Sequence, residues 1–464
     1  MNNLKIVEVR EKLKKREISC QDLVTDCLEK INSENKKLNA LLTVCSDQSL
    51  LRAKLADDLI KSDPYIFHQK PLLGIPLSLK DLFVTKGVKT TAGSKVLENY
   101  IPRYEGTVVK KLEQAGAIII GKTNLDAWAH GSSGENSDFG PTRNPYNTDY
   151  VPGGSSSGSA VAVATGMSLA ATGTDTGGSI RQPASFCNVV GLKPTYGRVS
   201  RYGVIAMASS LDSIGHFTTC VEDSALILSV TAGKDKYDAT TIKASVPDYL
   251  EKLKGEKGIK GLKIGIPKEY FSKGVDSKIS NLVNEKIKLL EKSGAEISQV
   301  SLPYSQYALA VYYIIQPAEV SSNLARFDGI RYGKNRDCFA SEAKRRIMLG
   351  TYILSAGYYD AYYLQAMKVR TLICDDFKRV FKNVDALIAP VSPTLPFKIG
   401  EKASDPLQMY LSDILTVPIN LAGLPALAIP VGMADNFPVG LQVIGPQLSE
   451  ELLFKIGNFL EKNG

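Results

Sequence analysis

The chain has 464 residues, of which 44% are hydrophobic and 22% charged, a balance typical of a folded soluble protein rather than a disordered one. Lys and Arg outnumber Asp and Glu by 56 to 48, giving a net charge of +8, but the charges are dispersed over helical faces and do not by themselves indicate a nucleic-acid partner. The sequence contains neither an apolar run of the roughly 18 residues that a membrane helix needs nor a secretion signal. Seven scattered cysteines without a CxxC pair indicate reduced thiols, no metal site and a cytoplasmic location.

The first predicted elements are helices within residues 1–60. Ser19 followed by Asp22 is the pattern of a capping box, and apolar residues at helical spacing come after it. The stretch "PLLGIPLSLKDLF" then predicts a buried strand and a turn, and "GTVVKKLEQAGAIIIGKT" predicts a helix, a glycine turn and a β-branched strand.

Residues 150–220 are rich in Gly, Ser, Ala and Thr. The regular stretch "SAVAVATGMSLAATGTD" favours a densely packed core over a linker. Later predicted elements are a strand in "GLKIGIPKEYF", helices over 280–292 and about 359–380, short buried strands in "VDALIAPVSP", "ALAIPVG" and "VGLQVIGP", and a closing helix in "EELLFKIGNFLEK". Because strands alternate with helices and no linker divides them, we expect an α/β fold with one central mixed sheet covered by helices on both faces. We expect a single domain over residues 1–464, with N-terminal helices over 1–60 and a core over 61–455.

One motif indicates nucleotide binding at first sight. "GAIIIGKT", residues 116–123, matches the pattern G-x-x-x-x-G-K-[ST] of phosphate-binding loops. Here β-branched residues predict a strand where such a loop needs flexible turns. We therefore expect no phosphate site at this position.

Ser179 is a candidate nucleophile because it follows Gly177 and Gly178 in "GTDTGGSIRQP", where backbone N–H groups can approach a negative atom. A base is less obvious, since each of the three histidines (His68, His130 and His216) is more readily explained as a structural or surface residue. Lys80 in "LSLKDLF" is the alternative. Burial would lower the pKa of Lys80 towards neutrality and make its amine a base. The residues alone favour this no more than a lysine at a strand end whose amine reaches solvent.

Three stretches together resemble the amidase-signature family: "GIPLSLKD", "PGGSSSGSA" and "GTDTGGSIRQPA". The resemblance implies a catalytic triad in which Ser179 is the nucleophile, Ser155 follows a cis peptide bond and relays a proton, and Lys80 is the base. Because the proton of Ser179 would pass to Ser155 and then to Lys80, this triad needs no histidine. The backbone N–H groups of Thr176, Gly177 and Gly178 would then form the oxyanion hole.

Within that family, stretches such as "NSDFGPTRNPYN", "KRRIMLG" and "LTVPINLAGLPALAIP" are similar to the glutamine-hydrolysing subunits of tRNA-dependent amidotransferases. The resemblance implies glutamine as substrate. Its carboxylate and ammonium groups call for a basic and an acidic residue, which match Arg346 (with Arg345 as its rival) and Asp413, and Tyr312 is a third expected contact.

The same resemblance implies partners rather than a cofactor on this chain. ATP and Mg²⁺ are expected at a B subunit, a small C subunit would clamp the two, and aminoacyl-tRNA would be reached through the complex. The ammonia would convert Glu-tRNA(Gln) to Gln-tRNA(Gln), with Asp-tRNA(Asn) left open as a second substrate. The alternatives are a stand-alone amidase acting on another small amide and a noncatalytic scaffold in a nucleic-acid complex.

Two features depart from the family pattern. Ser157 stands where glycine is commonest, and it needs a negative φ to be tolerated. The segment "KNRDCFASEA" before "KRRIMLG" is shorter than is usual in this branch of the family.

Overall fold

The computed structural model describes residues 5–463 apart from residues 64, 256–257, 273, 332 and 403–404. Within these residues one eleven-stranded sheet has the strand order β1-β3-β2-β4-β6-β5-β10-β11-β9-β7-β8. The strands are β1 (Leu41–Val44), β2 (Pro76–Lys80), β3 (Ile118–Thr123), β4 (Ala170–Asp175), β5 (Val190–Lys193), β6 (Ser213–Thr218), β7 (Lys263–Pro267), β8 (Glu296–Val300), β9 (Ala386–Pro390), β10 (Ala426–Ala434) and β11 (Phe437–Ile444).

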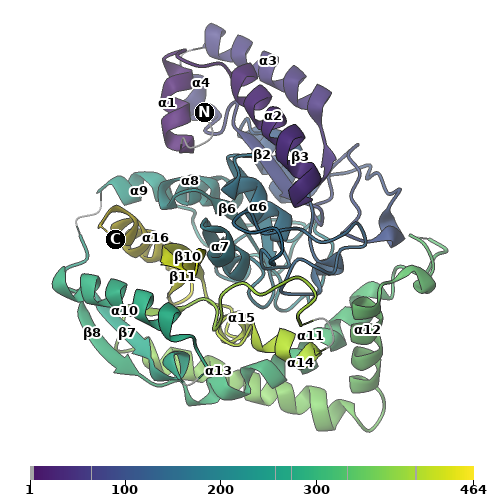
Figure 1. Ribbon diagram of the computed structural model, residues 1–464, viewed down its shortest axis with the longest axis vertical. Coiled ribbons are helices and arrows are strands. Elements are labelled where there is room, and N and C mark those ends of the chain that lie inside the picture. The colour runs from purple at the N-terminus through teal and green to yellow at the C-terminus, as the bar shows by residue number, and fades with distance from the viewer. Residues whose placement is uncertain are drawn as a thin grey trace.

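Sixteen α-helices surround the sheet in the described residues (Figure 1). They are α1 (Ile6–Lys14), α2 (Cys20–Leu38), α3 (Ser46–Ser62), α4 (Ile66–Gln69), α5 (Thr107–Gln114), α6 (Ser157–Ala164), α7 (Arg181–Cys187), α8 (Val221–Thr231), α9 (Tyr249–Gly255), α10 (Ser277–Lys292), α11 (Ala308–Leu324), α12 (Ser341–Ile353), α13 (Gln365–Val380), α14 (Pro406–Leu411), α15 (Val417–Leu421) and α16 (Glu450–Asn463). Among these described helices, none is long and apolar enough to cross a membrane.

The sheet is mixed, as predicted. β2 pairs in parallel with β3 and β4, and β7 pairs in parallel with β8 and β9. The other six neighbouring pairs are antiparallel. The parallel pairing places the carboxyl end of β2, where Lys80 lies, beside the carboxyl end of β4, which leads to Ser179.

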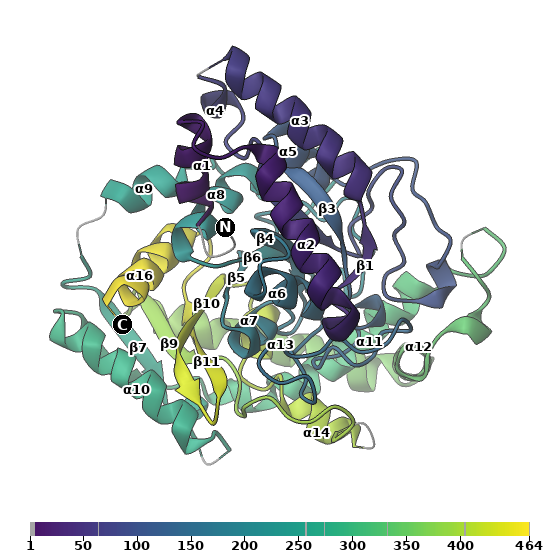
Figure 2. The same cartoon turned by 45° about the horizontal axis from the view of Figure 1, so that its top comes forward.

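Helices cover both faces of the sheet, which also confirms the prediction. Successive residues of a strand point to opposite faces, and along β10 Leu427 packs into one hydrophobic cluster while Ala426 and Ala428 pack into two others. The cluster around Leu427 contains residues of α5, α8, α10 and α16. The clusters on the opposite face contain residues of α6, α7, α11 and α13. Figure 2 shows α6 and α7 over the middle of the sheet, and α10 beside β7.

The N-terminal residues form the predicted helices with one addition. Ser19 caps α2, since its side chain accepts from the Asp22 N–H while the Asp22 side chain accepts from the Ser19 N–H, the reciprocal arrangement of a capping box. Between α2 and α3 the short strand β1, which the sequence did not predict, pairs antiparallel with β3. α1 docks on α8, where Asp223 accepts hydrogen bonds from the N–H groups of Ile6 (2.7 Å) and Val7 (3.0 Å).

Candidate active site

Lys80 ends β2 inside the protein, with 0% of its surface exposed. Its Nζ lies 2.8 Å from Ser155 Oγ, 2.9 Å from Ser156 Oγ and 2.7 Å from Thr174 Oγ1. The interpretation of Lys80 as a strand-end lysine that reaches solvent is therefore wrong. All three partners are neutral hydroxyls, and no described carboxylate forms an ion pair with this amine.

Burial lowers the pKa of Lys80 to about 7, although the charges of Asp126, Asp212 and Asp175 oppose the shift. A neutral amine donates two hydrogen bonds and accepts one. The Ser156 hydroxyl donates to the Thr174 carbonyl (3.2 Å), so that Ser156 must accept from Lys80. The lone pair of the amine can then accept the hydroxyl proton of Ser155.

Ser155 follows a cis peptide bond from Gly154. The carboxylate of Asp126 lies next to Gly154, so close that a side chain at residue 154 would overlap Asp126 Oδ2. Asp126 also accepts from the N–H groups of Gly134 (3.0 Å) and Asn136 (2.9 Å) and donates its own N–H to the Ser155 carbonyl (3.2 Å). Burial raises the pKa of Asp126 to about 6.

The first departure from the family pattern is tolerated as expected. Ser157 begins α6 and is not among the residues with positive φ. Its hydroxyl donates to Thr142 Oγ1 (3.0 Å), so the side chain is accommodated by a polar neighbour.

Ser179 lies in the turn between β4 and α7 and is 7% exposed. Its carbonyl accepts from the Ser156 N–H (3.2 Å), which joins this turn to the segment that carries Ser155. The turn is fixed by Asp175, whose carboxylate pairs with Arg181 (3.0 Å) and accepts from the Ile180 N–H (3.2 Å). Burial opposes the ionisation of Asp175, but Arg181 outweighs it and lowers the pKa of Asp175 to about 2.

The predicted oxyanion-hole residues lie in the same turn. In the described part of the chain, no residue accepts a hydrogen bond from the N–H of Thr176, Gly177 or Gly178, so these donors are available to a ligand. Gly178 has a φ of 140°, and a side chain there would overlap Thr416 Oγ1. Thr416 also donates to the Gly177 carbonyl (2.5 Å) and holds the turn from the other side.

Arg346 is 4% exposed on α12, and of the two neighbouring arginines that line the cavity described below it is the buried one. Its Nε donates to Glu342 (2.8 Å) and its Nη1 donates to Gln316 (2.6 Å). The guanidinium lies 5.2 Å from the ring centroid of Tyr313 and 5.6 Å from that of Tyr410. Its rival Arg345 is 47% exposed and pairs with the other oxygen of Glu342.

Asp413 lies near Arg346 and accepts from the Tyr313 hydroxyl (3.3 Å). Burial raises the pKa of Asp413 to about 8 against the opposing charge of Arg346. An ammonium group close to Asp413 would restore the ionised form. The pair thus offers one buried cation and one titratable acid, the two groups that a free amino acid needs.

A cavity of about 190 Å³ is lined by Arg346 and by Tyr313, the partner of Asp413, but not by Asp413 itself, and we call it the Arg346 cavity. Its lining includes Gly131, Ser132, Tyr313, Glu342, Arg346 and Tyr410 but not Ser179. Tyr312 connects the Arg346 cavity to the turn of Ser179. Its ring lies so close to Gly177 that a Cβ at residue 177 would come within 2.9 Å of it. The same ring packs edge-on against Tyr313, with 5.0 Å between the ring centroids. Of the three residues predicted to contact glutamine, Tyr312 lies against the turn of Ser179, whereas Arg346 and Asp413 lie around its neighbour Tyr313. Their role as substrate contacts stays a prediction.

The geometry supports neither a histidine as the base nor a phosphate-binding loop at residues 116–123. Among the described residues, no histidine forms a hydrogen bond with Ser179 or Ser155, and His216 bonds instead to Ser224 Oγ (2.8 Å). Lys122 of the phosphate-loop pattern lies in β3, is fully buried, and pairs with Asp81 at 3.0 Å. A lysine held in this way cannot reach a nucleotide.

Several residues of the site escaped the sequence analysis: Ser156, Thr174, Asp126, Tyr313 and Tyr410. Ser156 and Thr174 lie in a stretch full of hydroxyl residues, where only the pairing of β2 with β4 decides which of them meet Lys80. Asp126 is separated from Ser155 by a long loop and gives no local signal. Tyr313 could have been found, since it adjoins Tyr312 in "VYYII" and α11 presents both rings to the site.

Comparison with known proteins agrees with this geometry. Residues 22–454 match the model of the amidase family. The chain is 51% identical to the A subunit of the glutamyl-tRNA(Gln) amidotransferase of Geobacter metallireducens (99% of this chain, 97% of the relative) and 52% identical to that of Carboxydothermus hydrogenoformans (98% and 96%).

Solved structures agree as well. The A subunit of the glutamyl-tRNA(Gln) amidotransferase of Thermotoga maritima is 42% identical and superposes with a TM-score of 0.84 (100% of this chain, 95% of that one). A peptide amidase of Stenotrophomonas maltophilia is 28% identical with a TM-score of 0.83 (99% and 96%). The match over nearly the whole chain, together with the lysine, two serines and glycine turn in one place, means that this chain belongs to the amidase family.

Proposed function

We propose that this chain is the glutaminase subunit of a glutamyl-tRNA(Gln) amidotransferase, in which it hydrolyses glutamine to supply ammonia. The observation that carries the proposal is the position of buried Arg346 and Asp413 around Tyr313, whose neighbour Tyr312 packs against Gly177 in the turn of Ser179. A neutral amide needs neither charge, whereas free glutamine presents a carboxylate and an ammonium to them. The names of the relatives that are about half identical over their full length support the same assignment.

In the first half of the reaction, Ser179 Oγ attacks the side-chain amide carbon of glutamine. Its proton passes to Ser155 Oγ as the Ser155 proton passes to the neutral amine of Lys80. The oxygen of the tetrahedral intermediate receives hydrogen bonds from backbone N–H groups of the turn from Thr176 to Ser179.

In the second half, the carbon–nitrogen bond breaks and the relay returns a proton to the leaving nitrogen, which departs as ammonia. A glutamyl ester on Ser179 remains. Water attacks this ester with Lys80 again taking a proton through Ser155, and glutamate leaves as Ser179 regains its hydrogen.

The ammonia is used elsewhere in the complex. We propose a B subunit that holds ATP and Mg²⁺ and activates the glutamate carried by tRNA, and a small C subunit that joins the two. This chain itself would bind no cofactor, which agrees with the buried position of Lys122. We also propose a cytoplasmic location, supported by the absence of disulfides among the seven cysteines.

The test is ammonia release from glutamine and from asparagine by the purified chain, alone and with its candidate partner subunits. We expect glutamine turnover that increases with the partners and is lost in Ser179→Ala, with the variant's circular dichroism unchanged. Turnover of neutral amides without turnover of either amino acid would instead identify a stand-alone amidase and contradict the proposal.

A further inference from the structure

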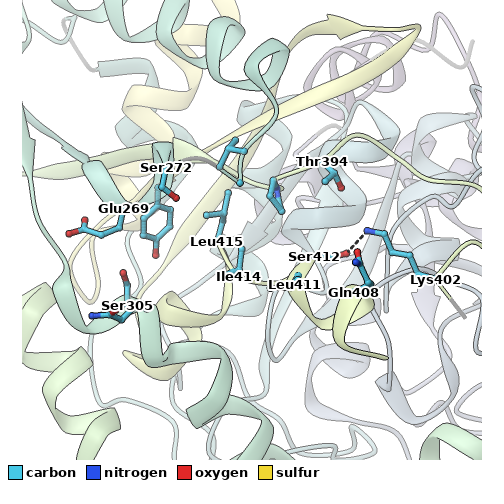
Figure 3. A pocket seen from close by; sticks show the side chains of 15 residues that line it. Glu269, Ser272, Ser305, Thr394, Lys402, Gln408, Leu411, Ser412, Ile414 and Leu415 are labelled. Carbon is cyan, nitrogen blue, oxygen red and sulfur yellow. Dashed lines mark hydrogen bonds between the residues drawn. The ribbon is translucent and has the colours of Figure 1, made fainter. Parts of the chain in front are cut away.

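A second cavity, of about 500 Å³, lies between the short helical turn η3 (Lys268–Phe271) and the segment of residues 408–415. We call it the η3 cavity. Its volume falls within the range of small-molecule sites, about 300–1,000 Å³. Figure 3 shows Ile414 and Leu415 on its wall between Glu269 on one side and Lys402 on the other. The cavity therefore has an apolar middle with a charged side chain towards each end.

The end formed by η3 carries polar atoms without partners. Tyr270 is 2% exposed and lines the cavity, and its hydroxyl has no hydrogen-bond partner among the described residues. Glu269 accepts from Ser301 Oγ (2.5 Å) through one oxygen, while its other oxygen is buried and unpartnered in the same described set. Both oxygens are shielded from solvent, so a ligand in the cavity packs against these side chains and does not bond to the two oxygens.

The opposite end carries a cation that lacks an anion. Lys402 is half-buried and donates to Ser412 Oγ at 3.3 Å, and its Nζ lies 4.1 Å from the ring centroid of Phe397. Burial lowers the pKa of Lys402. No carboxylate of the described residues forms a salt bridge with it, although the charges of Glu401, Asp413 and Glu135 oppose this pKa shift. An acidic group of a ligand would supply the missing charge.

We propose that the η3 cavity binds a small amphipathic organic anion. Its acidic group lies at Lys402, and its aromatic or aliphatic body packs on Leu411 and Leu415 towards the side chain of Tyr270. Apolar contact supplies affinity, and Lys402 fixes the orientation of the ligand.

The same segment lies between this cavity and the residues proposed to bind glutamine, and Lys402 lines both cavities. Leu411 and Ser412 line the η3 cavity, whereas Met409 and Tyr410 line the Arg346 cavity. Asp413, which follows Ser412 in the chain, accepts a hydrogen bond from the Tyr313 hydroxyl. Because an occupant would pack directly on the segment that carries Asp413, we expect it to change the KM for glutamine, a consequence that rests on the proposed function.

The probe for the site is 8-anilinonaphthalene-1-sulfonate, which joins a sulfonate, an aromatic body and one N–H donor and fluoresces when it is shielded from water. The blocking variant is Gly274→Trp. Gly274 lines the cavity, and a Cβ built on it meets no atom within 4 Å, so the substitution fills the cavity and leaves the fold intact. Gly255→Trp at the end of α9 is the matched control, because it is equally open and lies outside the lining.

We expect saturable binding of one probe per full-length chain, weakened at least tenfold by Gly274→Trp and unchanged by Gly255→Trp. Binding that is absent from the wild type would mean that only water occupies the cavity and would overturn the proposal. Equal affinity in the two variants would place the probe elsewhere and would also overturn it.

Coupling is measured as the KM for glutamine with and without saturating probe. We expect a change of at least threefold in the wild type and in Gly255→Trp, and none in Gly274→Trp. An unchanged KM alongside cavity binding would refute the link to Asp413 and leave the binding site standing. A chain that turns over no glutamine even without probe would refute the proposed function, while the fluorescence titration would still decide the inference about the cavity.

Discussion

At the scale of single residues, Lys80 is the group that we propose as the base. Three hydroxyls surround its amine, and burial brings its pKa to about 7. A carboxylate within ion-pair distance would instead favour the charged form. The site thus keeps a lysine that can be neutral near physiological pH, and we expect its two titratable residues, Lys80 and Asp413, to govern different kinetic constants.

The first prediction concerns pH. Lys80 acts as a base only when deprotonated, so kcat for glutamine should fall about tenfold per pH unit below pH 7 and level off above it. Asp413 binds an ammonium only when ionised, and because burial raises its pKa to about 8 the KM should rise as the pH falls below 8. Steady-state kinetics between pH 5.5 and 9.5 separate the two. In Asp413→Asn the pH dependence of KM should vanish, while kcat should still fall below pH 7. If the fall in kcat also vanished in this variant, the assignment of that fall to Lys80 would be contradicted.

The second prediction separates neighbouring arginines. Arg346 is buried between two tyrosines and Arg345 is 47% exposed. Removing one partner of a buried charge interaction costs about 2–5 kcal/mol, so Arg346→Ala should raise the KM for glutamine at least about 30-fold. Arg345→Ala should change it less than about fivefold, since exposed ion pairs contribute about 0–1 kcal/mol. Equal effects of the two variants on KM would contradict the pocket described here.

At the scale of elements, α1 packs through Ile6, Val9 and Leu13 into the hydrophobic core, and the carboxylate of Asp223 caps its first turn. Asp223→Ala would leave the N–H groups of Ile6 and Val7 without their acceptor, at a cost of about 1–3 kcal/mol. We expect a lower urea midpoint and faster amide exchange in α1. The neighbouring variant Glu222→Ala, which loses only a partly exposed pair with Lys462, should behave as wild type, and normal exchange in α1 of Asp223→Ala would show that other contacts hold the helix.

Elements whose signals are local were predictable from the sequence. The capping box of Ser19 marks α2, and β-branched residues mark β3. The segment predicted as one helix from Tyr359 instead begins with a π-helical turn over Tyr359–Leu364 before α13. Rings in this turn stack four residues apart, as Tyr359 does on Tyr363 (5.4 Å), and the hydrophobic periodicity did not distinguish this turn from an α-helix.

At the scale of the whole molecule, the sheet joins distant parts of the sequence. β10 pairs with β5, and Arg181 donates to Asn420 (2.5 Å) and Gln442 (3.0 Å). These contacts between distant segments explain why much of the site could not be predicted from the sequence, although the fold class could. The alternation of strands and helices specifies the class, whereas the residues that meet Ser179 depend on strand order, which no local pattern contains.

We propose that residues 1–464 form a single domain, and the fourth prediction tests this. The only tryptophan, Trp128, is buried in a cluster with Phe327 and Phe339. In urea, its fluorescence and the far-ultraviolet circular dichroism should change at one common midpoint, because the continuous sheet makes separate unfolding of either half unfavourable. Two distinct midpoints would show at least two independently folding units.

Gly154 has a consequence for how this enzyme can diversify. Any side chain there would displace Asp126, and the same carboxylate anchors Gly134 and Asn136 in the loop that lines the Arg346 cavity. Mutations in this loop would therefore disturb the proton relay together with substrate recognition. New substrate preferences are accessible instead from α12 and α14, whose side chains also line the cavity and, among the described residues, form no hydrogen bond with Asp126 or Ser155. Substrate specificity can therefore change through substitutions in α12 and α14, while the loop anchored by Asp126 is constrained by its connection to Ser155.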